Sequence, residues 1–293
     1  MKSSAAPSRV QVSLVQTWAD ADPKSNRLRT ASLVHRAADE GARIVCLQEL
    51  FTSKYFCHDE NIESFDLAEP LEGPTVEMFA PIARDRKIVI ILPIFERRSA
   101  GIYHNTAIVL DTDGSTAGIY RKMHIPHDPH FYEKYFFTPG DLGFRSIDTT
   151  LGKLGILICW DQWFPEAARL TAMQGAEILF YPTAIGWLHR EKENLGHTQH
   201  NAWETVQRGH AIANSLYVAA ANRVGIEGEL EFWGQSFACD PTGSIVAKGG
   251  HQEEIISFEF DRDLVAESRR QWPFLRDRRV DAYQGITQRL IDS

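Results

Sequence analysis

Apolar and polar positions in the first half of the chain change repeatedly between the period of strands and the period of helices. A two-residue period predicts a strand, and apolar residues three or four apart predict an amphipathic helix. The first half is therefore expected to form, in order, a strand at 9–16, a helix at 26–40, a strand at 42–48, a helix at 75–86 and strands at 87–95, 104–111 and 116–121. The last two strands are expected to form a hairpin around Asp113 and Gly114.

The second half repeats this alternation after a long irregular stretch. Its expected elements are a strand at 154–158, a helix at 165–174, a strand at 177–181, a long helix ending at 214, strands at 216–221, 234–240, 244–247 and 255–260, and a helix at 261–270. Residues 122–144 and 182–196 show no regular period. The first of these stretches is rich in His, Pro and aromatic residues and is too long for a simple connection, so it is a candidate functional loop.

These elements predict one mixed α/β domain over residues 1–293. The chain shows no internal repeat, low-complexity segment or linker, and residues 271–293 form a less regular C-terminal tail. Early strands separated by helices are expected to pair in parallel, whereas the hairpin strands are antiparallel. Two mixed sheets packed face to face, with helices on their outer faces, accommodate all of these elements.

Composition and charge narrow the classes of partner. Hydrophobic residues make up 43% of the 293 residues and charged residues 24%, which are ordinary globular values. No stretch is long and apolar enough to cross a bilayer, and the first residues lack the apolar core of a secretory signal, so a cytoplasmic protein is expected. A formal charge of −8 disfavours nucleic acid and anionic membranes and is compatible with a neutral or cationic small molecule.

Cysteine and histidine spacing argues against a metal site. The four cysteines include no C-x-x-C pair, so they are expected to be reduced thiols. The candidate histidines form no H-E-x-x-H motif or other convincing ligand set: His124, His127, His130, His197, His200 and His210. We therefore expect no metal.

The run LGILICWDQWFPEAA, from Leu154 to Ala168, contains the strongest candidate for a reactive group. An apolar strand stops at Cys159, and polar or bulky residues follow it before a helix that starts with proline. A thiol on such a turn lies at the carboxyl end of a sheet, near a helix amino end that favours a thiolate and near backbone N–H groups that can hold an oxyanion. The alternative is a buried core cysteine that acts as a small hydrophobe.

Three charged residues stand where partners of a cysteine nucleophile are needed. Glu49 follows an apolar strand and precedes aromatic residues, so a desolvated carboxylate that acts as a base is plausible, although a capping or surface role is the default. Lys122 ends a strand and opens the irregular loop, where it either is solvated or points at an oxyanion. Glu133 in the same loop either orients the lysine or lies on the surface. A Cys-His protease with His124 or His127 as the base ranks lower, because its local signature is missing.

Several motifs in a fixed order resemble one family across nearly the whole chain. They are LQELF around Glu49, YRKMHIP around Lys122, FYEKYFFTPGD around Glu133, ICWDQWFPEAARL around Cys159, GAEILFYPTAIG at 175–186, and QWPFLRDRRVDAY near the end. Together they resemble the nitrilase superfamily of carbon-nitrogen hydrolases, and within it most closely the N-carbamoylputrescine amidase branch.

The resemblance implies a four-layer αββα sandwich without a cofactor, assembled as a homodimer or larger homo-oligomer. It places a catalytic triad on Glu49, Lys122 and Cys159, with Glu133 in support. It makes the 271–293 tail a candidate contact between subunits. The residues expected to contact a small-molecule substrate are Trp160, Tyr55, His127, Asp128 and Trp187.

The implied reaction converts N-carbamoylputrescine into putrescine, ammonia and carbon dioxide. The chain departs from the branch at three positions that bear on the substrate: His127, His130 and Leu188. Some relatives carry at the position of Leu188 a glutamate suited to a distal ammonium, and Glu191, Asp128 and Asp161 are candidates to replace that charge. Ureido acids and aliphatic amides are therefore alternative substrates, and a non-catalytic scaffold is the alternative from another class.

Overall fold

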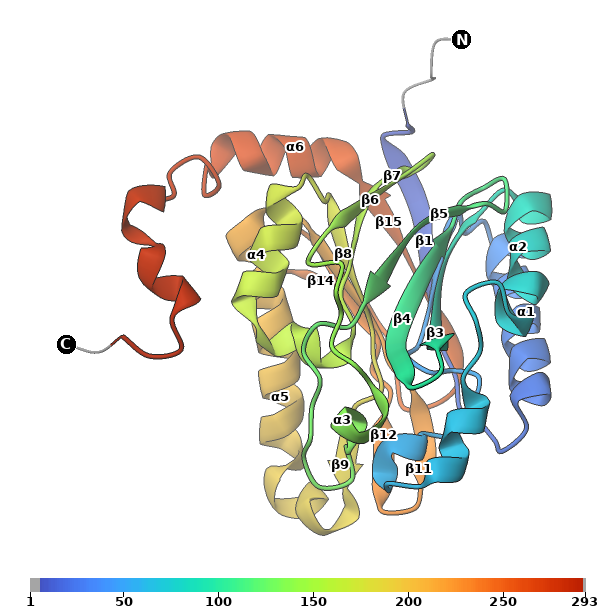
Figure 1. Ribbon diagram of the computed structural model, residues 1–293. Coiled ribbons are helices and arrows are strands. Elements are labelled where there is room, and N and C mark those ends of the chain that lie inside the picture. Colours follow the sequence, from blue (N-terminus) through green and yellow to red (C-terminus); the bar gives the residue numbers. More distant parts are fainter. Residues whose placement is uncertain (1–5, 292–293) are drawn as a thin grey trace.

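The computed structural model describes residues 6–291 and shows four layers. Two six-stranded sheets pack face to face, and helices cover the outer face of each (Figure 1). Both sheets are mixed, because each combines parallel and antiparallel neighbours. The predicted αββα sandwich is confirmed.

The first sheet has the strand order β15-β1-β2-β3-β4-β5. Its strands are β1 (Arg9–Gln16), β2 (Ile44–Leu47), β3 (Val89–Ser99), β4 (Ile102–Leu110), β5 (Thr116–Arg121) and β15 (Glu254–Asp261). Helices α1 (Pro23–Asp39) and α2 (Pro74–Arg86) pack against its outer face. Helix α1 begins at Pro23 because the carboxylate of Asp22 accepts hydrogen bonds from the N–H groups of Lys24 and Ser25.

The second sheet has the order β14-β13-β10-β8-β7-β6. Its strands are β6 (Ser146–Thr149), β7 (Gly152–Ile156), β8 (Ile178–Pro182), β10 (Tyr217–Ala221), β13 (Phe237–Cys239) and β14 (Ile245–Lys248). Helices α4 (Pro165–Met173) and α5 (His189–Asn214) cover its outer face (Figure 1). The predicted irregular stretch through residue 196 is wrong, because α5 already begins at His189. Its first turns are mostly polar and exposed, so they carry no apolar period.

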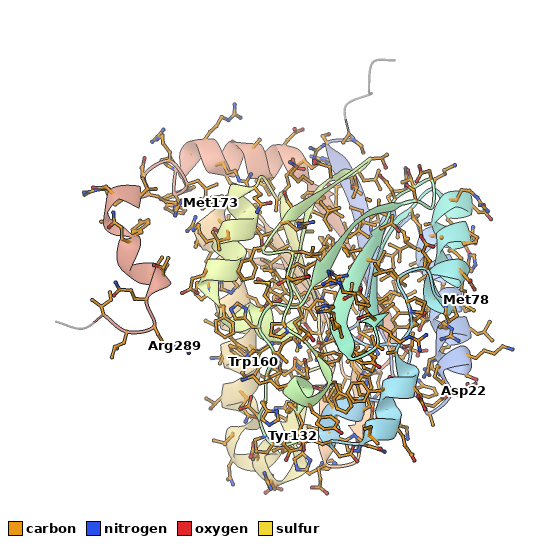
Figure 2. All side chains as sticks on the ribbon, viewed as in Figure 1. Asp22, Met78, Tyr132, Trp160, Met173 and Arg289 are labelled. Atoms are coloured by element: carbon orange, nitrogen blue, oxygen red, sulfur yellow. The ribbon has the colours of Figure 1, made fainter. Side chains whose placement is uncertain are left out.

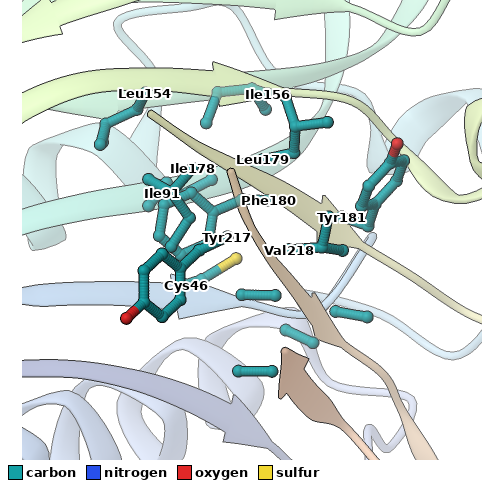
Figure 3. Close-up of a cluster of buried hydrophobic side chains, with 14 of the residues drawn as sticks. Cys46, Ile91, Leu154, Ile156, Ile178, Leu179, Phe180, Tyr181, Tyr217 and Val218 are labelled. Carbon is teal, nitrogen blue, oxygen red and sulfur yellow. The ribbon is translucent and has the colours of Figure 1, made fainter. Parts of the chain in front are cut away.

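The main core lies between the two sheets. Ile91 and Cys46 of the first sheet meet Ile156, Phe180 and Val218 of the second in one buried cluster (Figure 3). The neighbouring residues Val45 and Ile90 point to the other face and pack under α1 and α2. Because the parallel strands are buried on both faces, they read as nearly continuous apolar runs in the sequence.

A third, three-stranded sheet has the order β11-β12-β9 and was not predicted. It consists of β9 (Gly186–Leu188), β11 (Val224–Glu227) and β12 (Leu230–Trp233), at one end of the sandwich (Figure 1). A Cβ atom on Gly186 would lie 2.2 Å from the carbonyl oxygen of Glu231, so only glycine allows β9 to approach β12 this closely. These strands are too short to show a two-residue period.

The remaining elements are short, apart from α6. They are the 3-10 helices η1 (Phe56–His58), η2 (Ile62–Leu67), η3 (Cys159–Trp163), η4 (Val280–Ala282) and η5 (Gln284–Thr287), with the α-helices α3 (Glu133–Phe136) and α6 (Arg262–Gln271). After α6 the tail runs away from the sandwich and past α4 (Figure 1). Among the described residues, no helix has the length and apolar character needed to span a membrane.

Candidate active site

Strand ends supply the first three residues of the site. Glu49 lies two residues after β2, Lys122 lies directly after β5, and Cys159 lies three residues after β7 and opens η3. Glu133 is the first residue of α3, inside the irregular stretch that follows Lys122. The side chains of all four residues are buried. The fold therefore brings the four predicted catalytic positions into the interior.

The Lys122 ammonium lies between two carboxylates. Its Nζ atom is 2.8 Å from Oε1 of Glu49 and 2.6 Å from Oε2 of Glu133, and no part of the lysine is exposed. Burial alone would lower the pKa of Lys122, but the two carboxylates outweigh it and raise the pKa well above its usual value. The lysine is therefore a permanent cation at neutral pH.

Glu133 is a carboxylate whose ionisation is opposed by burial. Burial raises the pKa of Glu133 to about 7, against the opposing attraction of Lys122. Its second oxygen accepts a hydrogen bond from the hydroxyl of Tyr55 at 2.7 Å. Burial, and then the charge of Glu133, also raise the pKa of Tyr55, so the hydroxyl keeps its proton and donates it. Glu133 is thus held from both sides.

Glu49 keeps one carboxylate oxygen free of protein partners. Its Oε1 atom accepts hydrogen bonds from Lys122 and from Nδ2 of Asn105, the latter at 2.7 Å. Its Oε2 atom is buried and has no hydrogen-bond partner among residues 6–291. A buried acceptor of this kind is available to take a proton from a neighbouring group.

Cys159 has a strained backbone that other residues hold in place. Its φ angle is +42°, in the left-handed region that residues with a Cβ atom rarely adopt. The buried carboxylate of Asp161 accepts hydrogen bonds from the N–H of Ile158 at 3.0 Å and from His124 Nδ1 at 2.7 Å. Asp161 therefore ties the cysteine turn to the loop that follows Lys122.

The Cys159 thiol is neutral in the resting site. Burial raises the pKa of Cys159 well above its usual value, the charge of Glu49 raises it further, and Lys122 lowers it by less. Burial and the charge of Glu49 therefore oppose the thiolate that the adjacent helix end was expected to favour. Activation needs a base that takes the proton during attack.

A cavity of about 460 Å³ opens onto Cys159 and Glu133. Apolar and aromatic side chains form most of its wall, among them Phe131, Trp160, Trp163, Leu188, Leu195 and Trp233. The charged residues of the described wall are three carboxylates and no Lys or Arg: Asp128, Glu133 and Glu191. Glu133 shares Lys122 with Glu49, and Glu191 lies 3.7 Å from Arg190, which is exposed and outside the wall. The described wall therefore presents carboxylates and no basic side chain to the cavity.

Comparison with known proteins agrees with this geometry. The family model described as carbon-nitrogen hydrolase matches residues 11–270.

The chain belongs to the carbon-nitrogen hydrolase family.

Its relatives include an N-carbamoylputrescine amidase of Solanum lycopersicum, 42% identical over 94% of each chain. A citrullinase of Francisella tularensis is 38% identical over 96% of this chain and 99% of the relative. The crystal structure of a carbon-nitrogen hydrolase from Helicobacter pylori is similar with a TM-score of 0.94 and 47% identity, over 97% of this chain and 100% of that one. The chain is therefore an amide-hydrolysing enzyme of the nitrilase fold.

Two of the five expected substrate contacts of the hydrolase line the cavity, namely Trp160 and Asp128. Figure 2 shows Trp160 in the lower half of the molecule, above Tyr132. The other three expected contacts lie outside the wall. Tyr55 is buried behind Glu133, and His127 is exposed beside the ring of Tyr132.

Trp187 is not among the residues that line the cavity of the hydrolase. Its indole N–H donates to the carbonyl oxygen of Gly196 at 3.0 Å, so its polar group is occupied by α5. Three carboxylates were candidates to replace the glutamate missing at position 188. Asp128 and Glu191 line the cavity. Asp161 is fully buried, and its carboxylate accepts hydrogen bonds from within the protein. Leu188 lies in the wall, which makes that part apolar.

Asn105 is a site residue of the hydrolase that the sequence analysis missed. It lies within β4, whose neighbouring residues from Ala107 to Leu110 are apolar and buried. The polar run His104, Asn105, Thr106 in such a strand was the available signal, because a buried amide needs a partner. Among the described residues no group of three His, Cys, Asp or Glu side chains is arranged to hold a metal.

Proposed function

We propose that this hydrolase cleaves the carbon–nitrogen bond of an N-carbamoyl amine, with N-carbamoylputrescine as the first candidate. The observation that carries the proposal is the cavity, which joins Cys159 to a wall containing Asp128 and Glu191 and no described basic residue. Such a wall favours a substrate with a neutral ureido group at one end and a cation at the other. Relatives named N-carbamoylputrescine amidases, about 42% identical, support the same substrate.

In the first half of the reaction, Glu49 acts as the base. Its free Oε2 atom takes the proton of the Cys159 thiol while the sulfur attacks the ureido carbonyl carbon. Because the resting thiol is neutral, proton removal and attack belong to the same step. The Lys122 ammonium and the backbone N–H of Trp160 hold the oxygen that becomes negative.

In the second half, the carboxyl group of Glu49 first donates a proton and then accepts one. Glu49 returns the proton to the departing nitrogen, which leaves a carbamoyl group on the sulfur through a thioester-like bond. Glu49 then takes a proton from water, and the water oxygen attacks the carbonyl carbon and releases the thiol. The resulting carbamic acid decomposes to carbon dioxide and the nitrogen product that did not leave in the first half, which is either ammonia or putrescine. One water is consumed, and putrescine, ammonia and carbon dioxide are formed.

A ureido acid, which the citrullinase among the relatives supports, or an aliphatic amide is the alternative substrate. Citrulline carries a ureido group and an ammonium, but it also carries a carboxylate. The described cavity wall offers no basic side chain to pair with that carboxylate. An N-carbamoyl amine therefore fits the wall better than an N-carbamoyl amino acid or citrulline.

We further propose that the hydrolase forms a homodimer or larger assembly through its tail and works in the cytoplasm. Trp272, Val280 and Ile286 are each more than 60% exposed, and several large apolar side chains exposed along one segment are typical of a contact surface. The tail lies beside α4, where Arg278 donates to the sulfur of Met173, and Arg289 lies further out (Figure 2). The four cysteines are free and buried, which fits a reducing compartment.

Cys159→Ala is expected to abolish ammonia release from N-carbamoylputrescine, because no other described residue of the cavity wall is a comparable nucleophile. Cys239→Ala is the matched control, since Cys239 is also a free buried cysteine but lies in β13. The measurement is ammonia production by purified protein. Equal turnover by wild type and Cys159→Ala would exclude Cys159 as the nucleophile.

Glu191→Gln and Asp128→Asn are expected to weaken recognition of the cation without harming the chemistry. Loss of one charged contact should raise KM for N-carbamoylputrescine by roughly 10- to 100-fold, in line with charge-assisted hydrogen bonds. KM for N-pentylurea, which has a methyl group in place of the ammonium, should hardly change. Glu193→Gln, an exposed position on the same helix, is the control. Equal increases for both substrates would contradict this assignment.

Ile286→Asp is expected to reduce the assembly size, because a charge in a buried subunit contact must lose its water. Sedimentation velocity at micromolar concentration measures the size. Ile62→Asp serves as the control, since Ile62 is also largely exposed but lies in η2. A wild-type protein that sediments as a monomer would refute the proposed assembly.

A further inference from the structure

Arg223 is a buried cation that the proposed chemistry does not use. It lies between β10 and β11, and none of its surface is exposed. Its Nη1 atom is 3.1 Å from Oε1 of Glu227, whose side chain is also nearly buried. A buried ion pair costs desolvation, and its specific role is often to fix one arrangement of the surrounding chain.

The Arg223–Glu227 pair holds both ends of segment 50–55. Nη2 of Arg223 donates to the carbonyl oxygens of Leu50 at 2.8 Å and Ser53 at 2.7 Å. Oε2 of Glu227 accepts a hydrogen bond from the N–H of Tyr55 at 2.6 Å. The planar guanidinium suits this arrangement because it presents several donors in fixed directions.

Segment 50–55 needs an external hold. Leu50 has a φ angle of +50°, a conformation that a residue with a Cβ atom adopts only when its surroundings impose it. Its carbonyl oxygen is one of the two that Arg223 binds. The ion pair therefore acts at the strained residue that directly follows Glu49.

The two ends of the segment meet the two carboxylates of the site. Glu49 immediately precedes the segment, and Tyr55 ends it and donates through its hydroxyl to Glu133. Glu49 and Glu133 both bind Lys122. The Arg223–Glu227 pair therefore helps to position Glu49 through the backbone of segment 50–55 and Glu133 through the hydroxyl of Tyr55.

The same small sheet that carries the ion pair also forms part of the cavity wall. Glu227 lies on β11, which pairs with β12, and β12 pairs with β9. Gly186 and Leu188 of β9 and Trp233 of β12 line the cavity. Part of the cavity wall and the Arg223–Glu227 pair therefore belong to the same hydrogen-bonded sheet at one end of the molecule (Figure 1).

We propose that Arg223, paired with Glu227, is a positioning residue that aims the free oxygen of Glu49 at Cys159. The proposal rests on the proposed function of Glu49 as the base. Misplacing a catalytic group by about 1 Å can cost about 100-fold in rate, so a residue that touches neither substrate nor sulfur still controls turnover.

Arg223→Lys tests the proposal, because lysine keeps the charge but loses the planar grip on two carbonyl groups. We expect kcat to fall by about 10- to 100-fold and KM to change by no more than about threefold. Glu49 should move away from the sulfur, so the midpoint of iodoacetamide labelling at Cys159 should fall by about one pH unit. Peptide mass spectrometry follows labelling at Cys159 separately from the other thiols.

Arg262→Lys is the matched control. Arg262 also forms an ion pair with a glutamate, Glu177, and also donates to a backbone carbonyl group, but none of these groups lines the cavity. Both substitutions should lower Tm, whereas only Arg223→Lys should change kcat and the labelling midpoint. The proposal is overturned if Arg223→Lys lowers Tm but leaves kcat and the midpoint at wild-type values.

Glu227→Gln repeats the test with a milder change, for the case that Arg223→Lys does not fold. It keeps the side-chain shape and an acceptor for Tyr55 while removing the charge that holds Arg223. The same shifts in kcat and midpoint support the proposal, and unchanged values overturn it. If wild type hydrolyses no N-carbamoyl amine, the proposed substrate fails, whereas the labelling midpoints still decide the role of Arg223.

Discussion

The site depends on one buried ammonium between two carboxylates. Lys122 has no contact with solvent, and its charge is stabilised by Glu49 and Glu133 at hydrogen-bond distance. A buried charge that loses its partner is strongly destabilising, so the ends of β2 and β5 and the start of α3 must meet at one point. The four-layer fold satisfies this condition because the residues that follow β2 and β5 lie in its interior.

The two carboxyl groups of this cluster, Glu49 and Glu133, have different hydrogen-bond environments. Glu133 is satisfied by Lys122 and Tyr55, and burial raises its pKa to about 7. Glu49 shares the lysine but keeps one oxygen without a described partner. Together with the neutral thiol of Cys159, this arrangement favours a base that acts during attack over a preformed thiolate.

The sequence predicted those elements that show a hydrophobic period or contain a recognisable motif. The parallel strands read as apolar runs, so the positions after them, Glu49 and Cys159, were identified as site residues. The small sheet was missed because three- and four-residue strands show no period, and its path depends on Gly186 packing against β12. The directions of Tyr55 and Trp187 were not predictable, since each side chain donates a hydrogen bond whose acceptor no sequence motif indicates.

A paired measurement on Glu49→Gln tests the central account most directly, with Glu69→Gln as a control at a buried carboxyl group outside the site. The negative charge of Glu49 raises the pKa of Cys159, so its removal should move the labelling midpoint of that thiol to lower pH. Turnover should nevertheless fall by roughly 10²- to 10⁴-fold, because the base is lost. An unchanged or higher midpoint, or turnover close to wild type, would contradict the account.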